Sequence, residues 1–337
     1  MYMATLHVRF TFTSQEHYNL CAQVSSVVTV NTRAMLYLLI LTMVYTVFCD
    51  SNDGGKAPRI LLNDGNTMPV IGLGTFLGFD ENGQKQVKDS EVELPVMWAL
   101  NSGYRLIDTA SLYFNEEQVG RGIRKSSVPR ENVFIVTKAD HSGFDVVDYV
   151  DTWRSMEEAK TLGLAKSIGI SNFNISQIDR LLDNCHIKPA VLQVEVNLNL
   201  AQNKLIEHVK KDNIAVMAYT PFGGLFSKSQ GPPPPRKDHP ALVKLANKYG
   251  KTTPQIVLRY LVQRGLIPIP KTVHKERVEE NINIFDFELT PEEMKLLAEF
   301  NKDYRTVWPS FWQDHPYYPF EKKDVPDPDI FKAGLNE

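Results

Sequence analysis

From residue 58 onward the chain alternates between short, almost entirely apolar runs and longer stretches in which apolar residues recur every three or four positions. Short apolar runs predict strands that are buried on both faces, and the longer stretches predict amphipathic helices. This alternation is typical of repeated βα units around a parallel sheet. Seven strands are predicted, at residues 71–74, 104–107, 133–136, 165–170, 191–194, 214–218 and 266–269.

Helices are predicted between these strands. They span residues 87–101, 116–125, 148–162, 176–184, 203–211, 241–249, 254–263 and 275–283. A further helix begins at Thr290-Pro291, where a hydroxyl can cap the helix and proline suits the first helical position. Residues 59–69 read as a small hairpin because they contain Asn63-Asp64-Gly65, and this hairpin would cover the bottom of a barrel.

Parallel strands with crossover helices form either a closed barrel or an open doubly wound sheet. A doubly wound dinucleotide-binding domain has a GxGxxG run that opens its first helix. The similar run here, Gly72-Leu73-Gly74, continues with Thr75-Phe76 and lacks the third glycine. The sequence therefore favours an α/β fold of the TIM-type (β/α)8 barrel class over residues 58–337, with a doubly wound dehydrogenase as a distant alternative.

The first 57 residues form an N-terminal extension of a different kind. Residues 34–49 are mostly apolar, follow Arg33 and precede a polar, glycine-containing stretch. The run is shorter than the ~20 residues that cross a bilayer and suits the hydrophobic region of a signal peptide. We therefore expect a signal peptide, secretion, and no stable membrane span after its removal. A membrane anchor, a start at Met35 and a cytoplasmic protein remain alternatives.

Composition narrows the class of protein further. The chain is 43% hydrophobic and 23% charged, as expected of a soluble folded protein. A net charge of -3 without a basic block argues against nucleic acid as a partner. Cys21, Cys49 and Cys185 are widely spaced and odd in number, so they predict neither a disulfide framework nor a zinc site. We expect a monomer that binds no metal.

Four runs of residues resemble motifs of the aldo-keto reductase family. Residues 108–116, DTASLYFNE, resemble the family signature DTAxxYxNE. The other runs follow in the family's order: 168–173 (IGISNF), 193–197 (QVEVN) and 269–281 (IPKTVHKERVEEN). Four motifs together are far more specific than one. The resemblance covers residues 58 to the C-terminus apart from one gap, and it implies reduction of an aldehyde or ketone by hydride from NADPH.

The resemblance implies that Tyr113 donates the proton to the carbonyl oxygen of the substrate. A free phenol has a pKa near 10, and a nearby ammonium lowers that pKa. Lys138 would supply the ammonium, and Asp108 would pair with Lys138. Asp108 and Lys138 follow predicted strands at the ends where barrel enzymes place their chemistry. Outside this motif context, a structural ion pair and an ordinary aromatic residue would be equally good interpretations.

The resemblance also implies a binding site for NADP(H). Lys271 and Arg277 supply two cations at a helix start, which suits a phosphate and favours NADP over NAD. The implied contacts are Lys271, Thr272 and Arg277 for the adenosine 2′-phosphate, Glu280 and Asn281 for the adenine, Ser171, Asn172 and Gln193 for the nicotinamide amide, Tyr219 for stacking on the nicotinamide ring, and Thr75 for a further contact.

The sequence departs from the family after Lys138. There the family has a helix, a fourth strand ending in a catalytic histidine, and a long loop, whereas this chain has only the nine residues 139–147 before its next helix. A helix, a strand and two loops do not fit into nine residues. One βα unit is missing, which exposes two strand edges and lowers stability unless residues 144–150 bridge them. His141 replaces the lost histidine in one interpretation and is a solvent-exposed loop residue in the other.

Two functions follow from these observations. The first is an NADPH-dependent carbonyl reductase with a small-molecule substrate, weakened by the loss of the histidine. The second is a catalytically defective relative that binds cofactor or has no enzymatic role. Substrate choice depends largely on the loops over the barrel mouth, and one of these loops is deleted here. Two further segments have two interpretations each: they line an apolar pocket, or they pack on the surface. These segments are the loop at 222–238 and the aromatic tail at 308–318.

Overall fold

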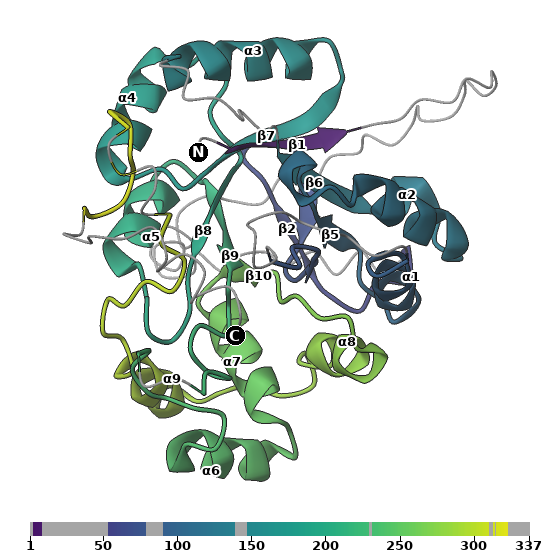
Figure 1. Cartoon of the computed structure of the whole chain (residues 1–337), viewed down its shortest axis with the longest axis vertical. Coiled ribbons are helices and arrows are strands. Elements are labelled where there is room, and N and C mark those ends of the chain that lie inside the picture. The colour runs from purple at the N-terminus through teal and green to yellow at the C-terminus, as the bar shows by residue number, and fades with distance from the viewer. Residues whose placement is uncertain are drawn as a thin grey trace, which may run out of the picture.

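The structure, a computed structural model, describes residues 53–78, 90–138, 147–228, 231–309, 313 and 315–322, and the backbone of residues 3–8. Strands lie at its centre and helices surround them (Figure 1). The strands form one eight-stranded sheet, in the order β10-β9-β8-β7-β1-β6-β5-β4, and a separate hairpin of β2 and β3. The α/β barrel expected from the sequence is therefore present.

All seven predicted strands are confirmed. They are β4 (Leu73–Gly74), β5 (Leu106–Asp108), β6 (Phe134–Lys138), β7 (Ala165–Ser171), β8 (Val191–Glu195), β9 (Ala215–Tyr219) and β10 (Leu266–Pro268). Pairing is parallel from β4 to β6 and from β7 to β10. Gly74 forms a parallel bridge with Lys271, and the N–H of Gly72 donates to the carbonyl of Pro268 at 3.1 Å. These contacts join β10 to β4 and close the sheet.

The predicted helices are also present; most ends shift by one or two residues, but the helix predicted from residue 87 begins at Glu93, and residues 87–89 lie outside the described residues. They are α1 (Glu93–Asn101), α2 (Glu116–Lys125), α3 (Tyr149–Thr161), α4 (Ile175–Asn184), α5 (Asn203–Lys210), α6 (Pro240–Tyr249), α7 (Thr253–Gln263), α8 (Lys275–Ile282) and α9 (Pro291–Ala298), with short 3-10 turns η2 (Ser111–Tyr113) and η3 (Arg130–Asn132). Thr290 caps α9 in a capping box with Glu293, as the sequence predicts.

The hairpin of β2 (Arg59–Leu61) and β3 (Thr67–Pro69) covers the end of the barrel at which the strands begin. Its Asn63 amide donates to the carbonyl of Pro189, just before β8, at 2.7 Å, and its Asn66 amide donates to the carbonyl of Lys166 in β7 at 3.1 Å. Met68 is fully buried in an apolar cluster with Leu106 and other strand residues. The predicted lid on the barrel bottom is confirmed.

The strands pack on both faces, which explains their apolar runs. In β8, Val191 belongs to the cluster that also holds Met68, whereas Leu192 and Val194 belong to the cluster around the outer helices. Alternate residues of a strand point to opposite faces of the sheet. Fully burying an aliphatic side chain contributes about 1.5–3 kcal/mol, so both clusters contribute to the stability of the barrel.

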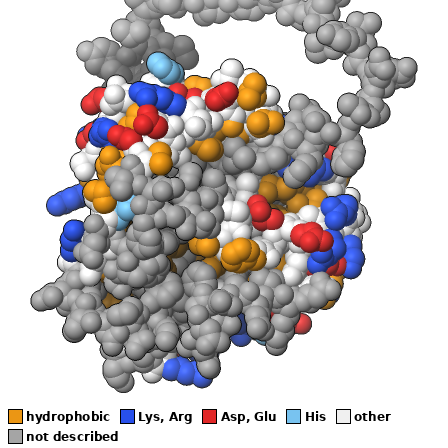
Figure 2. Space-filling model, turned by 45° about the horizontal axis from the view of Figure 1, so that its top comes forward, with side chains coloured by type: hydrophobic (Ala, Val, Ile, Leu, Met, Phe, Trp, Pro, Cys, Tyr) orange, Lys and Arg blue, Asp and Glu red, His pale blue; other side chains and the backbone are white. Residues whose placement is uncertain are grey.

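Charged side chains of both signs lie intermixed over part of the face shown in Figure 2. Many form exposed ion pairs within or between helices, such as Arg154 with Asp151 at 2.6 Å. Exposed pairs of this kind contribute only about 0–1 kcal/mol each. The contribution of a buried ion pair to the unfolding free energy can therefore be compared with that of these exposed pairs.

An eighth strand, β1 (Met3–Val8), was not predicted. It lies between β6 and β7 and is antiparallel to both, with Thr5 opposite Lys138 and Met3 opposite Ser171. The expectation of two exposed strand edges was therefore wrong. The signal in the sequence is the short alternation Thr5-Leu6-His7-Val8, which lies within the residues assigned to the N-terminal extension.

The alternative that residues 144–150 bridge the edges is also wrong where the structure describes them. Residues 147 and 148 are not in a strand, and α3 begins at Tyr149. His141 and the apolar run at 34–49 lie outside the described residues. Among the helices of the described ranges, none has the length and apolar character needed to cross a membrane.

Candidate active site

The predicted catalytic residues gather at the carboxyl end of the barrel strands. Asp108 is the last residue of β5, and Lys138 is the last residue of the neighbouring β6. Along each strand the inward positions change from apolar to polar, as from Leu106 to Asp108 and from Val191 to Gln193. The strands thus carry core residues at one end and polar groups at the other, which is the arrangement that barrel enzymes use.

The ion pair expected between Asp108 and Lys138 is present and buried. The Lys138 Nζ donates to Asp108 Oδ1 at 2.8 Å, to Asp108 Oδ2 at 2.9 Å and to the carbonyl of Thr109 at 2.7 Å. An ammonium has three donors, and these contacts occupy all of them. Burial lowers the pKa of Lys138, and the carboxylate of Asp108 opposes that shift.

Tyr113 lies beside this pair, at the end of the turn η2. Its ring centroid is 4.9 Å from Lys138 Nζ, and the ring packs against Phe76 at 5.0 Å between centroids. Burial, with a further contribution from Asp108, raises the pKa of Tyr113 well above its usual value. The predicted lowering by Lys138 is therefore not found, because the ammonium faces the ring and donates its hydrogen bonds to Asp108 and Thr109. The phenol is held in its protonated form.

Gln193 links the ion pair to the far side of the barrel. It lies on β8, is buried, and its Nε2 donates to Asp108 Oδ1 at 2.7 Å. The sequence predicts a nicotinamide contact for Gln193, and the structure brings this residue against the catalytic pair. The sequence did not predict this contact because it joins side chains of β8 and β5, which come together only in the closed barrel.

The other residues predicted to hold the nicotinamide lie next to Gln193. Ser171 ends β7 and is buried. Asn172 follows in a left-handed conformation with φ of 60°, and its N–H donates to the carbonyl of Gln193 at 3.0 Å. Tyr219, at the end of β9, donates from its hydroxyl to Asn172 Oδ1 at 2.9 Å. Burial raises the pKa of Tyr219 above its usual range. The four residues therefore form one polar group.

Thr75 joins a second network that holds the loop after β5. Its N–H and Oγ1 both donate to the carbonyl of Asp108, at 3.1 and 2.9 Å. Asn115 donates from its amide to the carbonyl of Thr75 at 2.8 Å and accepts from Thr109 Oγ1 at 3.1 Å. Asn115 is buried and fixes the segment that carries Tyr113. Its place in the motif at 108–116 was the available signal for this positioning role.

The two predicted phosphate-binding cations lie at the start of α8. Lys271 follows β10 and Arg277 lies in the first turns of α8, both exposed to solvent. Desolvation of the ammonium lowers the pKa of Lys271, Glu91 opposes the shift, and Arg277 lowers the pKa further. Thr272 accepts the N–H of His274 at 3.2 Å and shapes this turn. Two like charges held together at a helix start suit an anion.

The residues predicted to contact the adenine lie further along α8. Glu280 accepts a hydrogen bond from the Thr252 hydroxyl at 2.6 Å, and its carbonyl accepts from Gln255 at 3.0 Å. Asn281 is buried. The contacts of Glu280 attach α8 to the beginning of α7, so this residue also has a structural role.

The tail is anchored by a residue that the sequence did not single out for this role. Glu195 ends β8 and is completely buried, and its carboxylate accepts the N–H groups of Thr306 at 2.8 Å and Val307 at 2.9 Å. Burial raises the pKa of Glu195, and these two hydrogen bonds oppose the shift. Further along, the Tyr317 ring packs edge-on against Tyr149 at 5.2 Å. For Tyr317, surface packing is therefore the correct alternative.

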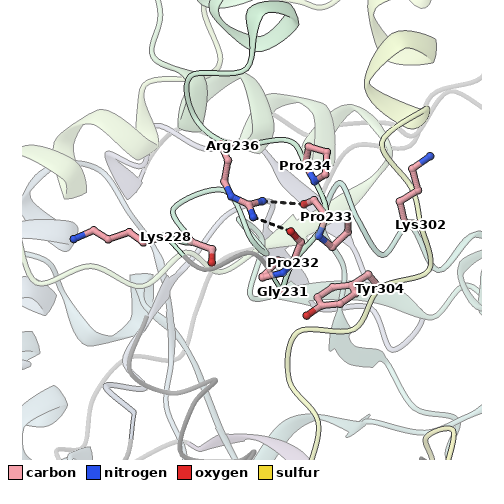
Figure 3. Close-up of a pocket in the computed structure, with 9 residues that line it drawn as sticks. Lys228, Gly231, Pro232, Pro233, Pro234, Arg236, Lys302 and Tyr304 are labelled. Atoms are coloured by element: carbon pink, nitrogen blue, oxygen red, sulfur yellow. Dashed lines mark hydrogen bonds between the residues drawn. The ribbon is translucent and has the colours of Figure 1, made fainter.

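The loop after β9 borders a hollow of about 670 Å³ together with Lys302 and Tyr304 (Figure 3). The Arg236 guanidinium donates to the carbonyls of Pro232 at 2.7 Å and Pro233 at 3.0 Å, so it holds the proline-rich loop. Lys302 and Lys228 point in different directions in this view. The hollow therefore does not gather these cations around one ligand.

Comparison with known proteins supports the family resemblance. The aldo/keto reductase family model matches residues 70–145 and 140–302. Aldo-keto reductase AKR2E4 of Bombyx mori is 44% identical over 308 residues, covering 78% of this chain and 99% of the relative. Human aldo-keto reductase family 1 member A1 is 34% identical over 328 residues, covering 78% of this chain and 98% of the relative.

Solved structures agree with these alignments. The crystal structure of the Bombyx mori AKR2E4 in complex with NADP has a TM-score of 0.74 at 43% identity and covers 78% of this chain and 99% of that one. The structure of AKR2E5 complexed with NADPH has a TM-score of 0.73 at 36% identity and covers 82% of this chain and 97% of that one.

The comparisons also bear on the interruption after β6. The two matched segments meet at residues 140–145, where the sequence predicts the missing unit. An alignment over 308 residues that covers only 78% of a 337-residue chain leaves this chain shorter than the relative across the aligned region. Because the family model spans most of the barrel and the relatives align almost from end to end, this chain belongs to the aldo/keto reductase family.

Proposed function

We propose that this chain is an NADPH-dependent reductase of aldehydes or ketones in which Tyr113 donates a proton to the carbonyl oxygen. The observation that carries the proposal is the half-buried Tyr113 beside the buried pair of Lys138 and Asp108, at the carboxyl end of β5 and β6. Burial raises the pKa of Tyr113, so the phenol is protonated at neutral pH but is a weaker acid than a free phenol. Its proton transfer therefore depends on stabilisation of the phenolate by Lys138 as the carbonyl oxygen gains negative charge.

NADP(H) is the cofactor, and the residues present fit it. Lys271 and Arg277 can pair with a 2′-phosphate because two neighbouring cations at a helix start gain from an anion between them. Asn172 and Gln193 present amide groups that match the amide of a nicotinamide. When bound, NADPH supplies the hydride that reduces the carbonyl carbon.

Lys138 has a defined task in this scheme. As Tyr113 gives up its proton, negative charge develops on the phenolate, and the ammonium 4.9 Å from the ring centroid stabilises that charge. Asp108 and the carbonyl of Thr109 fix the position of the ammonium through hydrogen bonds. Gln193 in turn holds Asp108. The carbonyl carbon receives hydride and the oxygen receives a proton, which gives an alcohol.

A second function competes with this one because a whole βα unit is missing after β6. A positioned acid–base or orienting group typically contributes about 10²–10⁴-fold to rate. Without the histidine that the family resemblance implies, the chain would bind NADPH and turn over slowly. If turnover is lost altogether, the chain is a cofactor-binding relative without catalytic activity.

A titration of the full chain with NADPH, followed by aldehydes and ketones in the same sample, tests both functions. We expect NADPH binding and carbonyl-dependent oxidation, with Tyr113→Phe binding NADPH equally well but oxidising it at least ~100-fold more slowly. Binding without oxidation would favour the second function. Equal oxidation by Tyr113→Phe would remove Tyr113 as the proton donor, and absence of binding would contradict both functions.

A further inference from the structure

A gap one strand wide separates β6 from β7. The two strands do not pair with each other in the described structure, and each pairs with β1 instead. Neighbouring strands elsewhere in the barrel run parallel, whereas β1 runs antiparallel to both of its neighbours. β1 is therefore not a member of the series of βα units but an insert from the distant N-terminal part of the chain.

The register of β1 places it against both halves of the active site. Thr5 lies opposite Lys138, which carries the ammonium of the catalytic pair. Met3 lies opposite Ser171, which ends β7 beside the group predicted to hold the nicotinamide. The pairing of β1 therefore defines the main-chain position of the last residue of each neighbouring strand.

The chain leaves β1 at the same end of the barrel at which the described residues resume. Val8 lies opposite Ala165, at the start of β7 and hence at the bottom of the barrel. Asp53 is also held at the bottom, where Arg105, just before β5, donates to its carbonyl at 2.8 and 2.6 Å. An extended chain spans about 3.3–3.6 Å per residue, so residues 9–52 connect the two points with length to spare.

An empty gap would leave two inner strand edges with unpaired N–H and C=O groups. Such edges accept any strand that can reach them, and buried unpaired groups are costly. A leader that forms β1 pairs with both edges at once, along most of β7 and at the last two residues of β6. Cleavage near residue 49, as expected for a signal peptide, would remove β1 and reopen the gap.

We propose that the gap between β6 and β7 is a strand-binding site that the chain fills with its own residues Met3–Val8, and that this filling holds the active site in place. The N-terminal leader is then a working part of the enzyme, and its proteolytic removal switches the site off. The strand-binding step is independent of the proposed reductase function, and only the effect on activity rests on it.

Hydrogen exchange of the full chain tests the strand-binding step without any assay of activity. Backbone amides within residues 3–8, above all those of Thr5 and Leu6, should exchange at least ~100-fold more slowly than in an unstructured peptide, because these two residues pair with both β6 and β7. Exchange at the rate of an unstructured peptide would overturn the proposal.

A pair of substitutions at one position sharpens this measurement. Thr5→Pro removes a ladder donor and places proline in a strand with two neighbours, where it is not tolerated. We expect lost protection in β1 and along the facing edges of β6 and β7, with β8 and β9 still protected. Thr5→Val keeps the N–H and a strand-forming side chain, and should behave like the unmodified chain. Equal protection in the two variants would contradict the proposal.

Two deletions separate β1 from the rest of the leader. Removal of residues 20–45 takes out most of the apolar run but leaves β1 and a connecting segment, so protection and NADPH oxidation should be retained. A chain that starts at Asp53 should lose both. A synthetic peptide of residues 1–13 added to that shorter chain should restore both. If the shorter chain is as protected and as active as the full chain, the proposal fails; if it aggregates, the Thr5 variants decide.

Light scattering distinguishes filling by the same chain from filling by a second copy. We expect a monomer that keeps its protection of residues 3–8 on dilution. A dimer that loses this protection on dilution would show exchange of β1 between copies and overturn filling within one chain. Full protection without any NADPH oxidation would instead contradict the proposed reductase function and leave the strand-binding site standing.

Discussion

Two parts of the same barrel are closed in different ways. β7 to β10 come from consecutive βα units, and each strand pairs in parallel with the next. Between β6 and β7 the neighbour is β1, which comes from the far end of the chain and runs the other way. In both parts each strand has a paired neighbour, and β1 pairs with β6 at Thr5 and Leu6 and with β7 along most of its length. Closing a barrel therefore requires only that each strand edge pairs with another backbone, and a strand from a distant part of the chain can provide that pairing.

Catalysis makes a different demand, because the carboxyl end of each barrel strand delivers a particular side chain. β1 runs in reverse, so its first residue rather than its last lies level with Ser171. His7 lies between Leu6 and Val8, which are opposite Ile168 and Ala165, and hence lies toward the barrel bottom. The strand is thus replaced without replacing the histidine that the family resemblance implies.

The largest effect is expected from breaking the ion pair where β6 meets β1. Lys138→Met leaves the carboxylate of Asp108 buried without its cation, which typically costs about 3–5 kcal/mol of unfolding free energy. We also expect NADPH oxidation to be lost. Urea unfolding measures the first effect, and an NADPH assay under conditions where the variant is folded measures the second.

The matched control is Arg154→Met, which breaks the exposed pair with Asp151. It should change the unfolding free energy by no more than about 1 kcal/mol and leave activity intact. Equal stability of the Lys138 and Arg154 variants would show that the buried pair does not hold the junction.

A substitution at the start of α8 is expected to change the preference for NADPH over NADH. Arg277→Met should weaken NADPH binding by about 10–100-fold, because a hydrogen bond to a charged group contributes roughly 1.5–3 kcal/mol. NADH lacks the 2′-phosphate, so its affinity should hardly change. Fluorescence titration with both nucleotides measures the ratio.

Lys275→Met removes an equal charge from the first turn of α8 and serves as the control. It should lower NADPH affinity much less than Arg277→Met does. The same loss in both variants would point to the general field of the helix start instead of a phosphate contact at Arg277.

A smaller effect on the unfolding free energy is expected for the hydrogen bond from Gln193 on β8 to Asp108 on β5. Gln193→Met removes the donor to Asp108 at nearly constant volume and should cost about 1–3 kcal/mol. Its effect should not add to that of Lys138→Met, since both act on Asp108, but should add to that of Arg154→Met. Additivity in both pairs, measured by urea unfolding, would show that Gln193 does not act through Asp108.

The smallest effect concerns the pH dependence at Glu195. Burial raises the pKa of this carboxyl above its ordinary value of 4.5, so folding favours the protonated form. Its contribution to stability is therefore complete below that value and is lost as the pH rises through the raised pKa. Relative to Glu195→Gln, the unmodified chain should lose stability as the pH rises above 4.5. Parallel unfolding curves across this range would contradict the raised pKa.

Local patterns were sufficient for the seven parallel strands and for the helices between them. A strand buried on both faces leaves an apolar run, and capping residues such as Thr290 mark the start of a helix. The pair of Asp108 and Lys138 was likewise predicted from a motif and from the position of each residue after a strand. These features depend on neighbours in sequence or on one strand end.

Other features depend on contacts between distant segments. Pairing of β1 with β6 and β7, the hydrogen bond from Gln193 to Asp108, and the anchoring of the tail by Glu195 all require the closed barrel. The pKa of Tyr113 was predicted in the wrong direction because a motif identifies its charged neighbours but not how deeply they bury the phenol. The burial of the Tyr113 phenol depends on how elements that are distant in sequence pack around it.

The most direct test of the account is hydrogen exchange of residues 3–8 in the full chain saturated with NADPH. We predict strong protection of these amides together with that of β6 and β7, and loss of all three in Thr5→Pro but not in Thr5→Val. Rapid exchange of residues 3–8 alongside fully protected β6 and β7 would contradict it, because the barrel would then be closed by something other than β1.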